Sequence, residues 1–380
     1  MKTHNTIIIG AGASGCMCAI TTQNKDVAII DSNYQIAKKI LVTGNGKCNL
    51  TNINTDSTKY NCNIDKYLKK FSVDDTLSFF QDLGLETYTD DMGRVYPMSN
   101  SAKSVVDILE RAVISKATVY NNTLVQKISK TNTGFEIVCD NETFSCNNLV
   151  LATGGNTIDL LKSLSIQTTP ISPSLVALHT NSTKNLNNVR LSNVKVTATC
   201  NNTTMEDIGE VLFKDSGVSG IVSFNLSTLF SRQHNFSGNI SIDLLPNMST
   251  DDLKEMLIRR KSLNLPMHKY FVGLFQNQVA DEILRQSKLN TNKISDYLAS
   301  SDIEVLISTI KSLSFEVDGH YDNNQVYSGG IPLIDLSDHL EHRNIPNLYI
   351  TGELCDVDGE CGGYNLQWAW TSGHIVGENL

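Results

Sequence analysis

The sequence predicts an α/β protein in which one domain of parallel strands is interrupted by two insertions. Three observations predict this fold class. A buried strand, a helix rich in small residues and a second buried strand follow one another within the first 31 residues. Two later apolar segments, 149–152 and 347–351, again have the composition of buried parallel strands. Between them the hydrophobic pattern changes to strand-like alternation and then to helical spacing.

Length, charge and cysteine usage narrow the class of protein. The 380 residues exceed one ordinary compact domain, so we expect two or three. A net charge of −9 argues against a general binder of polyanions. No apolar stretch reaches the roughly 20 residues that a membrane helix needs. The nine cysteines contain no CxxC pair and no zinc-ligand spacing, which indicates reduced thiols in a cytoplasmic protein and predicts no metal site.

The N-terminal elements form a βαβ pattern, with a strand at 5–10, a helix at 13–23 and a strand at 27–31. Capping-box spacing at Ser249 with Asp252, and at Ser301 with Glu304, predicts two helix starts. The other expected elements, in chain order, are helices at 73–83 and 101–116, strands at 123–129, 135–139, 143–146 and 149–152, mostly strand-like text over 173–246 including strands at 194–199 and 240–244, helices over 249–311, a strand at 347–351 and a last helix from Leu366.

A glycine motif joins the first strand to the first helix: Gly10, Gly12 and Gly15 have GxGxxG spacing. The first glycine permits a tight turn, the second lets the backbone approach a diphosphate, and the third lets helix and strand pack closely. Backbone N–H groups at the helix start would face the phosphate charge. Asp31, at the end of the next strand, is placed to accept hydrogen bonds from a ribose diol. The motif predicts a Rossmann-type dinucleotide-binding domain, for NAD or FAD.

Two further glycine-rich segments favour FAD. Residues 151–155 end a buried strand, as in FAD domains where such a segment approaches the cofactor from the other side. Near the C-terminus a strand leads to Gly352-Glu353 and Asp358, and Gly362-Gly363 then opens a helix. A helix N-terminus near the flavin N1–C2=O edge stabilises the negative charge of the reduced ring. Either segment alone could be an ordinary glycine turn, so the combination with the first motif carries the prediction.

A polar, glycine-rich loop at 41–52 follows the second strand, where it would lie over the cofactor. It is not a P-loop, because Gly46-Lys47 is followed by Cys48 rather than Ser or Thr, and Leu41 stands where the first glycine belongs. Cys48 could be a redox thiol. With no second cysteine in the motif, we expect a small packed residue instead.

These residues resemble the BaiN/YhiN-like (aminoacetone oxidase-like) family of NAD(P)/FAD-dependent oxidoreductases over nearly the whole chain. The strings 48–52 (Cys-Asn-Leu-Thr-Asn) and 362–367 (Gly-Gly-Tyr-Asn-Leu-Gln) are its most specific features. The chain departs from the family pattern at Ala37-Lys38, where Gly-Arg is usual, and at Lys214-Asp215, where Thr-His is usual. The second departure falls in an insertion, so it puts a shared substrate in doubt.

The resemblance implies a Rossmann-type FAD/NAD(P)-binding domain with an inserted β-barrel and a small helical domain. We expect the FAD-binding domain at 1–172 and 320–380, the barrel at 173–246 and 312–319, and the helical domain at 247–311. FAD would be bound non-covalently. The expected cofactor-binding residues are Gly10, Gly12, Ala13, Ser14, Gly15, Asp31, Lys39, Gly46, Asn49, Leu50, Val125, Ala152, Thr153, Gly154, Gly352, Glu353, Asp358, Gly363, Tyr364, Asn365 and Leu366.

The leading hypothesis for function is a reductase that passes a hydride through flavin N5 to a conjugated small molecule. No second GxGxxG occurs, so NAD(P)H as electron donor would dock only transiently. The alternatives are an aminoacetone-like amine oxidase, an RNA-modifying flavoprotein, which the acidic charge disfavours, and a non-catalytic FAD-binding protein. We expect a small-molecule partner, no nucleic acid and no membrane. The sequence identifies no catalytic acid or base and no oligomeric state; the candidate contacts, each more often structural, are Arg94, Tyr96, Lys214 and His374.

Overall fold

The structure, a computed structural model, describes residues 1–155, 158–180 and 183–380. Contacts within the described chain divide it into two compact units. The first holds Met1–Ser172 and Val326–Leu380, and the second holds Pro173–Gln325. The second unit contains both insertions, so the division into three domains stays a prediction.

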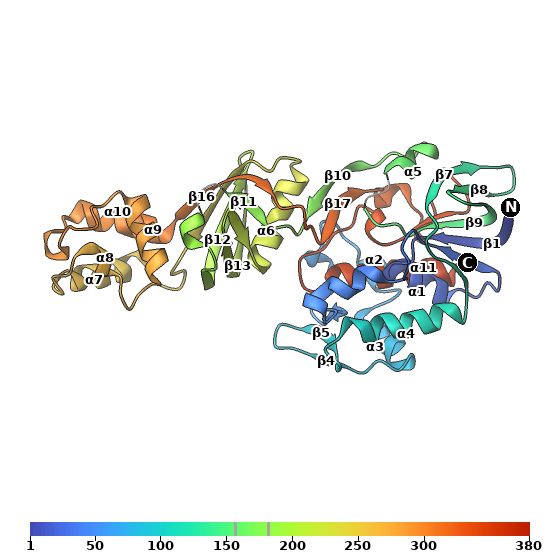
Figure 1. The fold of residues 1–380 in the computed structure, drawn as a ribbon, viewed down its shortest axis with the longest axis horizontal. Helices are drawn as coiled ribbons and strands as arrows, with labels where there is room; N and C mark the ends of the chain where they lie inside the picture. Colours follow the sequence, from blue (N-terminus) through green and yellow to red (C-terminus); the bar gives the residue numbers. More distant parts are fainter. Residues whose placement is uncertain (156–157, 181–182) are drawn as a thin grey trace. The chain divides into compact units, whose positions relative to one another are not determined.

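The first unit is built on a seven-stranded sheet whose centre is parallel (Figure 1). Strand β2 is buried at every position, as expected for a strand covered on both faces. The carboxyl ends of the parallel strands meet at one edge, where α/β proteins bind their ligands. The parallel strands, in spatial order, are β6 (Thr118–Tyr120), β2 (Val27–Ile30), β1 (Lys2–Ile9), β9 (Thr143–Leu151) and β18 (Leu348–Ile350), and β8 (Phe135–Cys139) and β7 (Val125–Lys130) continue the sheet antiparallel from β9.

Two helices, α1 (Ala13–Thr21) and α11 (Tyr364–Glu378), pack closely in this unit. A Cβ added at Gly373 would lie 2.4 Å from the backbone oxygen of Ser14. A Cβ added at Gly377 would lie 2.0 Å from Thr21 Oγ1. The two glycines of α11 therefore let the helices approach more closely than any side chain would allow.

The rest of the first unit is a set of short elements around this core. A capping box at Ser72 and Asp75 starts α3. A small antiparallel sheet of β3, β5 and β4 was not predicted, because its strands are only two to four residues long. The bounds are β3 (Thr51–Asn52), α2 (Asp65–Leu68), α3 (Val73–Asp82), β4 (Thr87–Thr89), β5 (Arg94–Pro97), α4 (Ala102–Ile114) and α5 (Ile158–Ser163), with β10 (Thr169–Ser174) and β17 (Val326–Gly330) pairing where the chain leaves and re-enters the unit.

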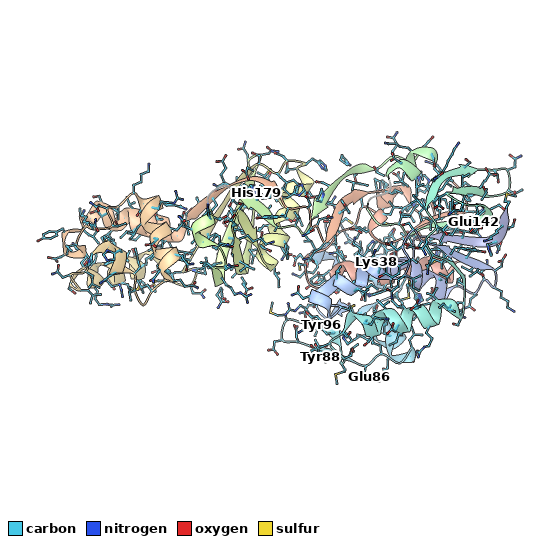
Figure 2. The ribbon with its side chains drawn as sticks, viewed as in Figure 1. Lys38, Glu86, Tyr88, Tyr96, Glu142 and His179 are labelled. Atoms are coloured by element: carbon cyan, nitrogen blue, oxygen red, sulfur yellow. The ribbon has the colours of Figure 1, made fainter. Side chains whose placement is uncertain are left out.

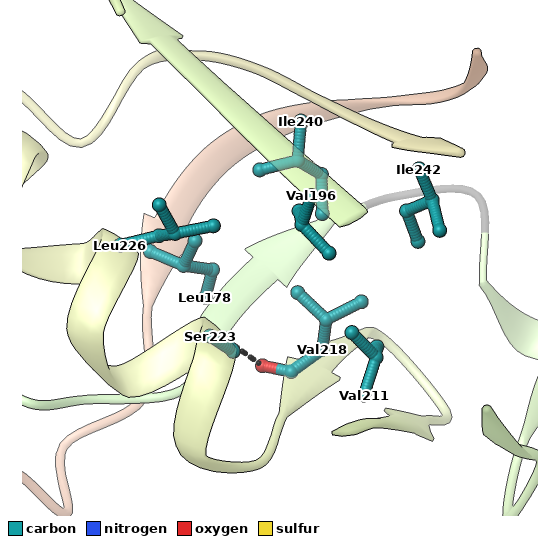
Figure 3. Close-up of a pocket in the computed structure, with 8 residues that line it drawn as sticks. All are labelled: Leu178, Val196, Val211, Val218, Ser223, Leu226, Ile240 and Ile242. Atoms are coloured by element: carbon teal, nitrogen blue, oxygen red, sulfur yellow. Dashed lines mark hydrogen bonds between the residues drawn. The ribbon is translucent and has the colours of Figure 1, made fainter. Parts of the chain in front are cut away.

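The second unit contains a closed antiparallel barrel, which confirms the expected fold class. Helix α6 (Ile221–Arg232) packs against β12 (Arg190–Cys200) and β13 (Thr203–Lys214) (Figure 1). Eight side chains, seven of them apolar, close around a small space in the interior, where Ser223 Oγ donates to the backbone oxygen of Val218 at 3.0 Å (Figure 3). The barrel is therefore a packed core. Its strands, in spatial order, are β11 (Leu178–Thr180), β14 (Gly217–Ser219), β13 (Thr203–Lys214), β12 (Arg190–Cys200), β15 (Gly238–Asp243) and β16 (Leu313–His320).

Of the two helix starts predicted in the second unit, one is confirmed and one is wrong. Ser249 accepts a hydrogen bond from the backbone N–H of Asp252, so that helix start is confirmed. The predicted capping box at Ser301 and Glu304 is wrong, because α10 begins two residues earlier and Asp302 accepts from the backbone N–H of Ala299. The helices are α7 (Thr250–Lys261), α8 (Met267–Tyr270), α9 (Asn277–Ser287) and α10 (Ser300–Lys311).

Three other expectations are corrected. The strands expected at 143–146 and 149–152 are one continuous strand, β9, because β1 pairs with both parts, from Phe144 to Leu151. The segment 173–246, which was expected to form mostly strands, contains the helix α6, whose apolar residues pack against the barrel. The last helix begins at Tyr364 rather than Leu366, since Gly363 is its N-cap.

Candidate functional site

The turn between β1 and α1 has the geometry that the glycine motif predicts. Gly10 has a φ of +101°, and a Cβ there would lie 2.4 Å from the backbone oxygen of Ala152. A Cβ at Gly15 would lie 1.9 Å from the backbone oxygen of Gly10. A Cβ at Gly12, in contrast, would have no described protein atom within 4 Å. The space beside Gly12 is therefore open to a ligand.

The N-terminus of α1 faces this open space. Gly12 is the N-cap, no described side chain caps it, and the first turn holds no acidic residue. The early N–H groups of the helix, beginning with Ala13, can therefore bind an anion such as a diphosphate. Ser14 is buried, and its hydroxyl lies 3.2 Å from Thr351 Oγ1 after β18. Its side chain thus joins α1 to the C-terminal segment.

Asp31 is held at the carboxyl end of β2 by backbone groups. Its Oδ2 accepts from the N–H of Ala11 at 2.7 Å, and its Oδ1 accepts from the N–H of Asn33 at 2.7 Å. The backbone oxygen of Asp31 also accepts from Thr123 at 2.9 Å. This last bond brings the start of β7, with the buried Val125, next to the Asp31 segment. The structure thus brings these two expected residues to one edge.

Lys39, Glu353 and Gly154 come from three separate segments and meet in the structure. Lys39 Nζ forms an ion pair with Glu353 Oε2 at 3.0 Å. A Cβ at Gly154 would lie 3.1 Å from the same oxygen. Glu353 Oε1 accepts from the backbone N–H of Tyr327 at 2.6 Å, which fixes the carboxylate. Thr153 lies between Gly154 and Ala152, with its Cα 3.0 Å from a Cβ added at Gly10.

Gly352 is the point where α1, α11 and β18 meet. It has a φ of +65°, and a Cβ there would lie 2.6 Å from Ser14 Oγ. Its N–H donates to Ser372 Oγ at 2.8 Å, and its oxygen accepts from Trp368 Nε1 at 2.9 Å. Ser372 and Trp368 were not among the expected residues, because nothing in a helical pattern marks a side chain that anchors a distant loop.

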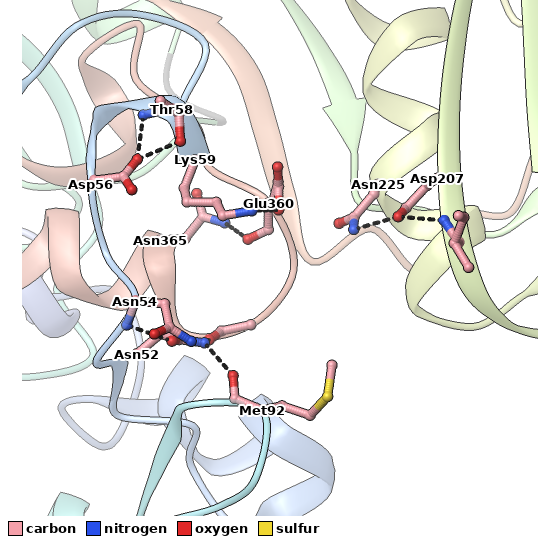
Figure 4. Close-up of polar contacts among 12 residues, drawn as sticks. Asn52, Asn54, Asp56, Thr58, Lys59, Met92, Asp207, Asn225, Glu360 and Asn365 are labelled. Atoms are coloured by element: carbon pink, nitrogen blue, oxygen red, sulfur yellow. Dashed lines mark hydrogen bonds and ion pairs between the residues drawn. The ribbon is translucent and has the colours of Figure 1, made fainter. Parts of the chain in front are cut away.

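Three expected residues bond to or within the loop that precedes α11, and Figure 4 shows one of them, Asn365. The Asn365 side chain accepts from the N–H of Gly359 at 2.9 Å and donates to the oxygen of the same residue at 2.8 Å. Asp358 is buried, and its backbone N–H and oxygen both bond to Asn61. The backbone oxygen of Tyr364 accepts from the Tyr60 hydroxyl at 2.8 Å. These contacts shape the loop, and Lys59 pairs with Glu360 beside it at 3.0 Å.

Asn49 lies against the N-terminus of α11. Gly363, the N-cap of that helix, has a φ of +101°, and a Cβ there would lie 2.8 Å from Asn49 Oδ1. Asn49 Oδ1 is buried and has no hydrogen-bond partner in the described part of the chain. Leu50 is fully buried, and its backbone oxygen accepts from Trp370 Nε1 at 2.9 Å. This loop therefore presents one unsatisfied polar atom at a helix N-terminus.

Two other residues of this loop and helix, Cys48 and Leu366, pack in or against the core of the first unit. Burial raises the pKa of the Cys48 thiol to about 12, so this cysteine is a protonated, packed residue near neutral pH. Gly46 is exposed at the end of the 3₁₀ segment Lys38–Gly46, and only Leu41 O comes within 4 Å of a Cβ there. Leu366 is partly buried against the core of the first unit. Within the described residues, no contact brings Gly46 to the other expected residues.

The candidate substrate contacts also have structural partners. Arg94 forms an ion pair with Asp90 at 2.7 Å. Tyr96 stacks on Tyr88, with ring centroids 5.8 Å apart (Figure 2). Lys214, in the second unit, lies over the Tyr321 ring at 4.7 Å.

His374 packs inside the first unit, with its ring centroid 4.0 Å from that of Phe71. Burial lowers the pKa of His374, and the charges of Glu378 and Asp75 oppose this effect. A lowered pKa means that the unfolded chain takes up the proton more readily than the folded chain. The contribution of His374 to the free energy of unfolding is therefore fully present above the ordinary histidine pKa of about 6.5. It declines as the pH falls through that value toward the folded-state pKa.

We expect His374→Gln to remove this pH dependence. Urea unfolding of both proteins between pH 7.5 and 5 should show a steeper decline for the wild type, by at most the slope of one proton, about 1.4 kcal/mol per pH unit. If the free energies of unfolding of wild type and variant changed with pH in parallel, burial of His374 would not be the cause of this pH dependence.

The fold and the site define a Rossmann-type flavoprotein oxidoreductase. The sequence matches the family described as HI0933-like protein Rossmann domain over residues 4–379, and the chain belongs to this family. The family resemblance expected from the sequence is thereby confirmed. Among the residues that the structure describes, none of the helices combines the length and apolar character needed to cross a bilayer.

Two curated relatives match almost end to end. The chain is 33% identical to a 3-dehydro-bile acid delta(4,6)-reductase of Clostridium scindens, over 97% of each chain. It is 28% identical to a ribosomal RNA dihydrouridine synthase of Escherichia coli, over 100% of this chain and 98% of that protein. Among solved structures, 3-ketosteroid-delta4-(5alpha)-dehydrogenase from Rhodococcus jostii RHA1 has a similar fold, with a TM-score of 0.50, 11% identity, and coverage of 99% of this chain and 96% of that chain.

Proposed function

We propose that the protein is an FAD-dependent reductase of a carbon–carbon double bond conjugated to a carbonyl. The observation that carries this proposal is the open space at Gly12, in front of an uncapped helix N-terminus. That arrangement suits a diphosphate. Asp31, at the end of the neighbouring strand, suits a ribose diol. The unsatisfied Asn49 Oδ1 at the start of α11 suits a polar ring edge. Together these features match the three parts of FAD.

The expected cofactor residues then fall into groups. Gly10, Gly12 and the first turn of α1 would hold the diphosphate, and Asp31 the ribose. Lys39, whose ion pair with Glu353 lies beside Gly154, would add positive charge near the cofactor. When bound, FAD supplies hydride transfer at N5, while the protein supplies binding, orientation and electrostatics.

The names of the two relatives support the same reaction type. A 3-dehydro bile acid with double bonds at positions 4 and 6 is a conjugated dienone, and the Clostridium protein is named as its reductase. Dihydrouridine differs from uridine by saturation of the double bond next to a ring carbonyl. Both names thus describe an enone-like group that gains two hydrogens. This shared chemistry favours a reductase over an amine oxidase.

A second candidate substrate is uridine in RNA. The end-to-end match to ribosomal RNA dihydrouridine synthases of Escherichia coli and Haemophilus influenzae favours it. The net charge of −9 disfavours it, because RNA binding normally requires a basic surface. We therefore prefer a small conjugated ketone or acid, with NADH or NADPH as the reductant that docks transiently.

The experiment is an anaerobic titration of the FAD-loaded protein. We expect NADH or NADPH to bleach the flavin absorbance, and a steroid-like enone to restore it in the absence of oxygen. Restoration by uridine-containing RNA alone, with salt-sensitive RNA binding, would transfer the proposal to the second candidate. A flavin that neither nicotinamide reduces, or a chain that takes up no FAD, would overturn it.

A further inference from the structure

One polar atom at the N-terminus of α11 lacks a partner although its surroundings are closed. Asn49 is only 9% exposed, and its Oδ1 has no hydrogen-bond partner in the described part of the chain. A buried acceptor without a donor destabilises a protein, because the loss of its hydration is not compensated. Such groups are rare in folded proteins, and each one calls for a donor from outside the chain or for a stated function.

The neighbouring polar side chains on the same segment are satisfied by the protein itself. Thr51 Oγ1 donates to Gln367 Oε1 at 2.6 Å. Asn52 Nδ2 donates to the backbone oxygen of Gly362 at 3.0 Å (Figure 4). The unsatisfied Oδ1 of Asn49 is therefore not a general feature of this segment.

The position of Asn49 Oδ1 limits which ligand group can reach it. A Cβ at Gly363 would lie 2.8 Å from this oxygen and 2.6 Å from the backbone oxygen of Thr51, so only glycine lets the start of the helix lie this close to the 49–51 segment. Gly363 is the N-cap of a 15-residue helix, and no described side chain caps it. The helix N-terminus attracts an electron-rich carbonyl, while the Asn49 oxygen beside it requires an N–H or O–H donor.

A carbonyl next to an N–H is the pattern of a cyclic imide. The isoalloxazine ring of FAD carries this pattern at its pyrimidine edge, where N3–H adjoins C2=O. We propose that Asn49 Oδ1 accepts a hydrogen bond from flavin N3–H, with C2=O at the N-terminus of α11. Asn49 is then the positioning residue that sets the orientation of the ring. This inference rests on the proposed binding of FAD and adds which edge of the flavin the protein recognises.

The test compares FAD with 3-methyl-FAD, in which the N3 donor is replaced by a methyl group. Dissociation constants of both are measured by fluorescence titration of the apoprotein, for wild type, Asn49→Ala and Asn379→Ala. Asn379 is the matched control, because it follows the opposite end of α11 and its side chain, among the described residues, bonds only to the Ile375 oxygen, at 2.7 Å. We expect wild type and Asn379→Ala to prefer FAD by about tenfold or more, the loss of one hydrogen bond.

In Asn49→Ala the dissociation constants of FAD and 3-methyl-FAD should be nearly equal, because the acceptor is gone and there is space for the methyl group. Asn49→Asp provides a second variant of nearly equal size. It retains the acceptor, so it should keep the preference for FAD, and its negative charge should lower the reduction potential of the bound flavin.

The other possible results contradict either the contact between Asn49 and N3–H or the binding of FAD. An undiminished preference in Asn49→Ala, or no preference in the wild type, overturns the contact with N3–H while FAD binding stands. A wild-type chain that binds neither flavin overturns the proposed function itself.

Discussion

Replacing Gly12 by alanine is expected to weaken FAD binding strongly while leaving the apoprotein folded. An added Cβ meets no described atom within 4 Å, and the φ of −77° is open to any residue. The free energy of unfolding should therefore stay within about 1 kcal/mol of the wild type, the usual effect of alanine at an N-cap. The methyl group would occupy the space in front of α1, where the diphosphate must come closest.

We expect the dissociation constant for FAD to rise by about ten- to a hundredfold, which corresponds to the loss of one charge-assisted hydrogen bond. Urea unfolding of the apoprotein and fluorescence titration with FAD measure the two quantities separately. Gly15→Ala is the matched comparison, since its Cβ would lie 1.9 Å from the backbone oxygen of Gly10. That variant should lose stability together with FAD binding. Unchanged FAD affinity in Gly12→Ala would place the diphosphate elsewhere.

Replacing Gly373 by alanine is expected to destabilise the protein by about 3 kcal/mol, the upper part of the range for overpacking a close contact. Helix propensity alone predicts the opposite sign, because alanine in a helix interior is favoured over glycine by about 1 kcal/mol. The added Cβ would lie 2.4 Å from the Ser14 oxygen and 2.9 Å from Met17 Cβ. A backbone oxygen cannot rotate away, so α1 and α11 would have to move apart.

The measurement is the urea midpoint of the apoprotein, with Gly12→Ala as the control for an alanine that enters open space. Separation of the two helices should also weaken FAD binding, because both helix N-termini face the proposed cofactor. A Gly373→Ala protein that is as stable as the wild type, or more so, would show that the helices are not in close contact at this point.

Local chemistry made part of the fold and site predictable. Gly10, Gly12 and Gly15 could be interpreted from sequence because their roles depend on a single turn and on the helix that follows it. The expected burial of Cys48 is likewise a property of one short loop. Helix α6 was not predicted, because its apolar residues pack against a barrel whose strands lie on both sides of it in the chain.

The capping box at Ser301 failed for a related reason. The residue types at 301 and 304 have the right spacing, yet the helix begins at Ser300, where Asp302 bonds to the N–H of Ala299 and to Lys293. Capping residues compete over one or two positions, and contacts from elsewhere in the chain decide between them.

The sequence by itself determined the βαβ unit, the glycine turn and the acid at the end of the second strand, since each is encoded within a few tens of residues. It also determined the family, because short and specific strings of residues carry that resemblance. Only the tertiary structure decided that Asn49 meets Gly363, that Lys39 pairs with Glu353, and that Gly352 joins α1 to α11. The partners in the first two pairs lie more than 300 positions apart in the chain. Packing of the whole unit creates such contacts, so no local pattern of residues could have predicted them.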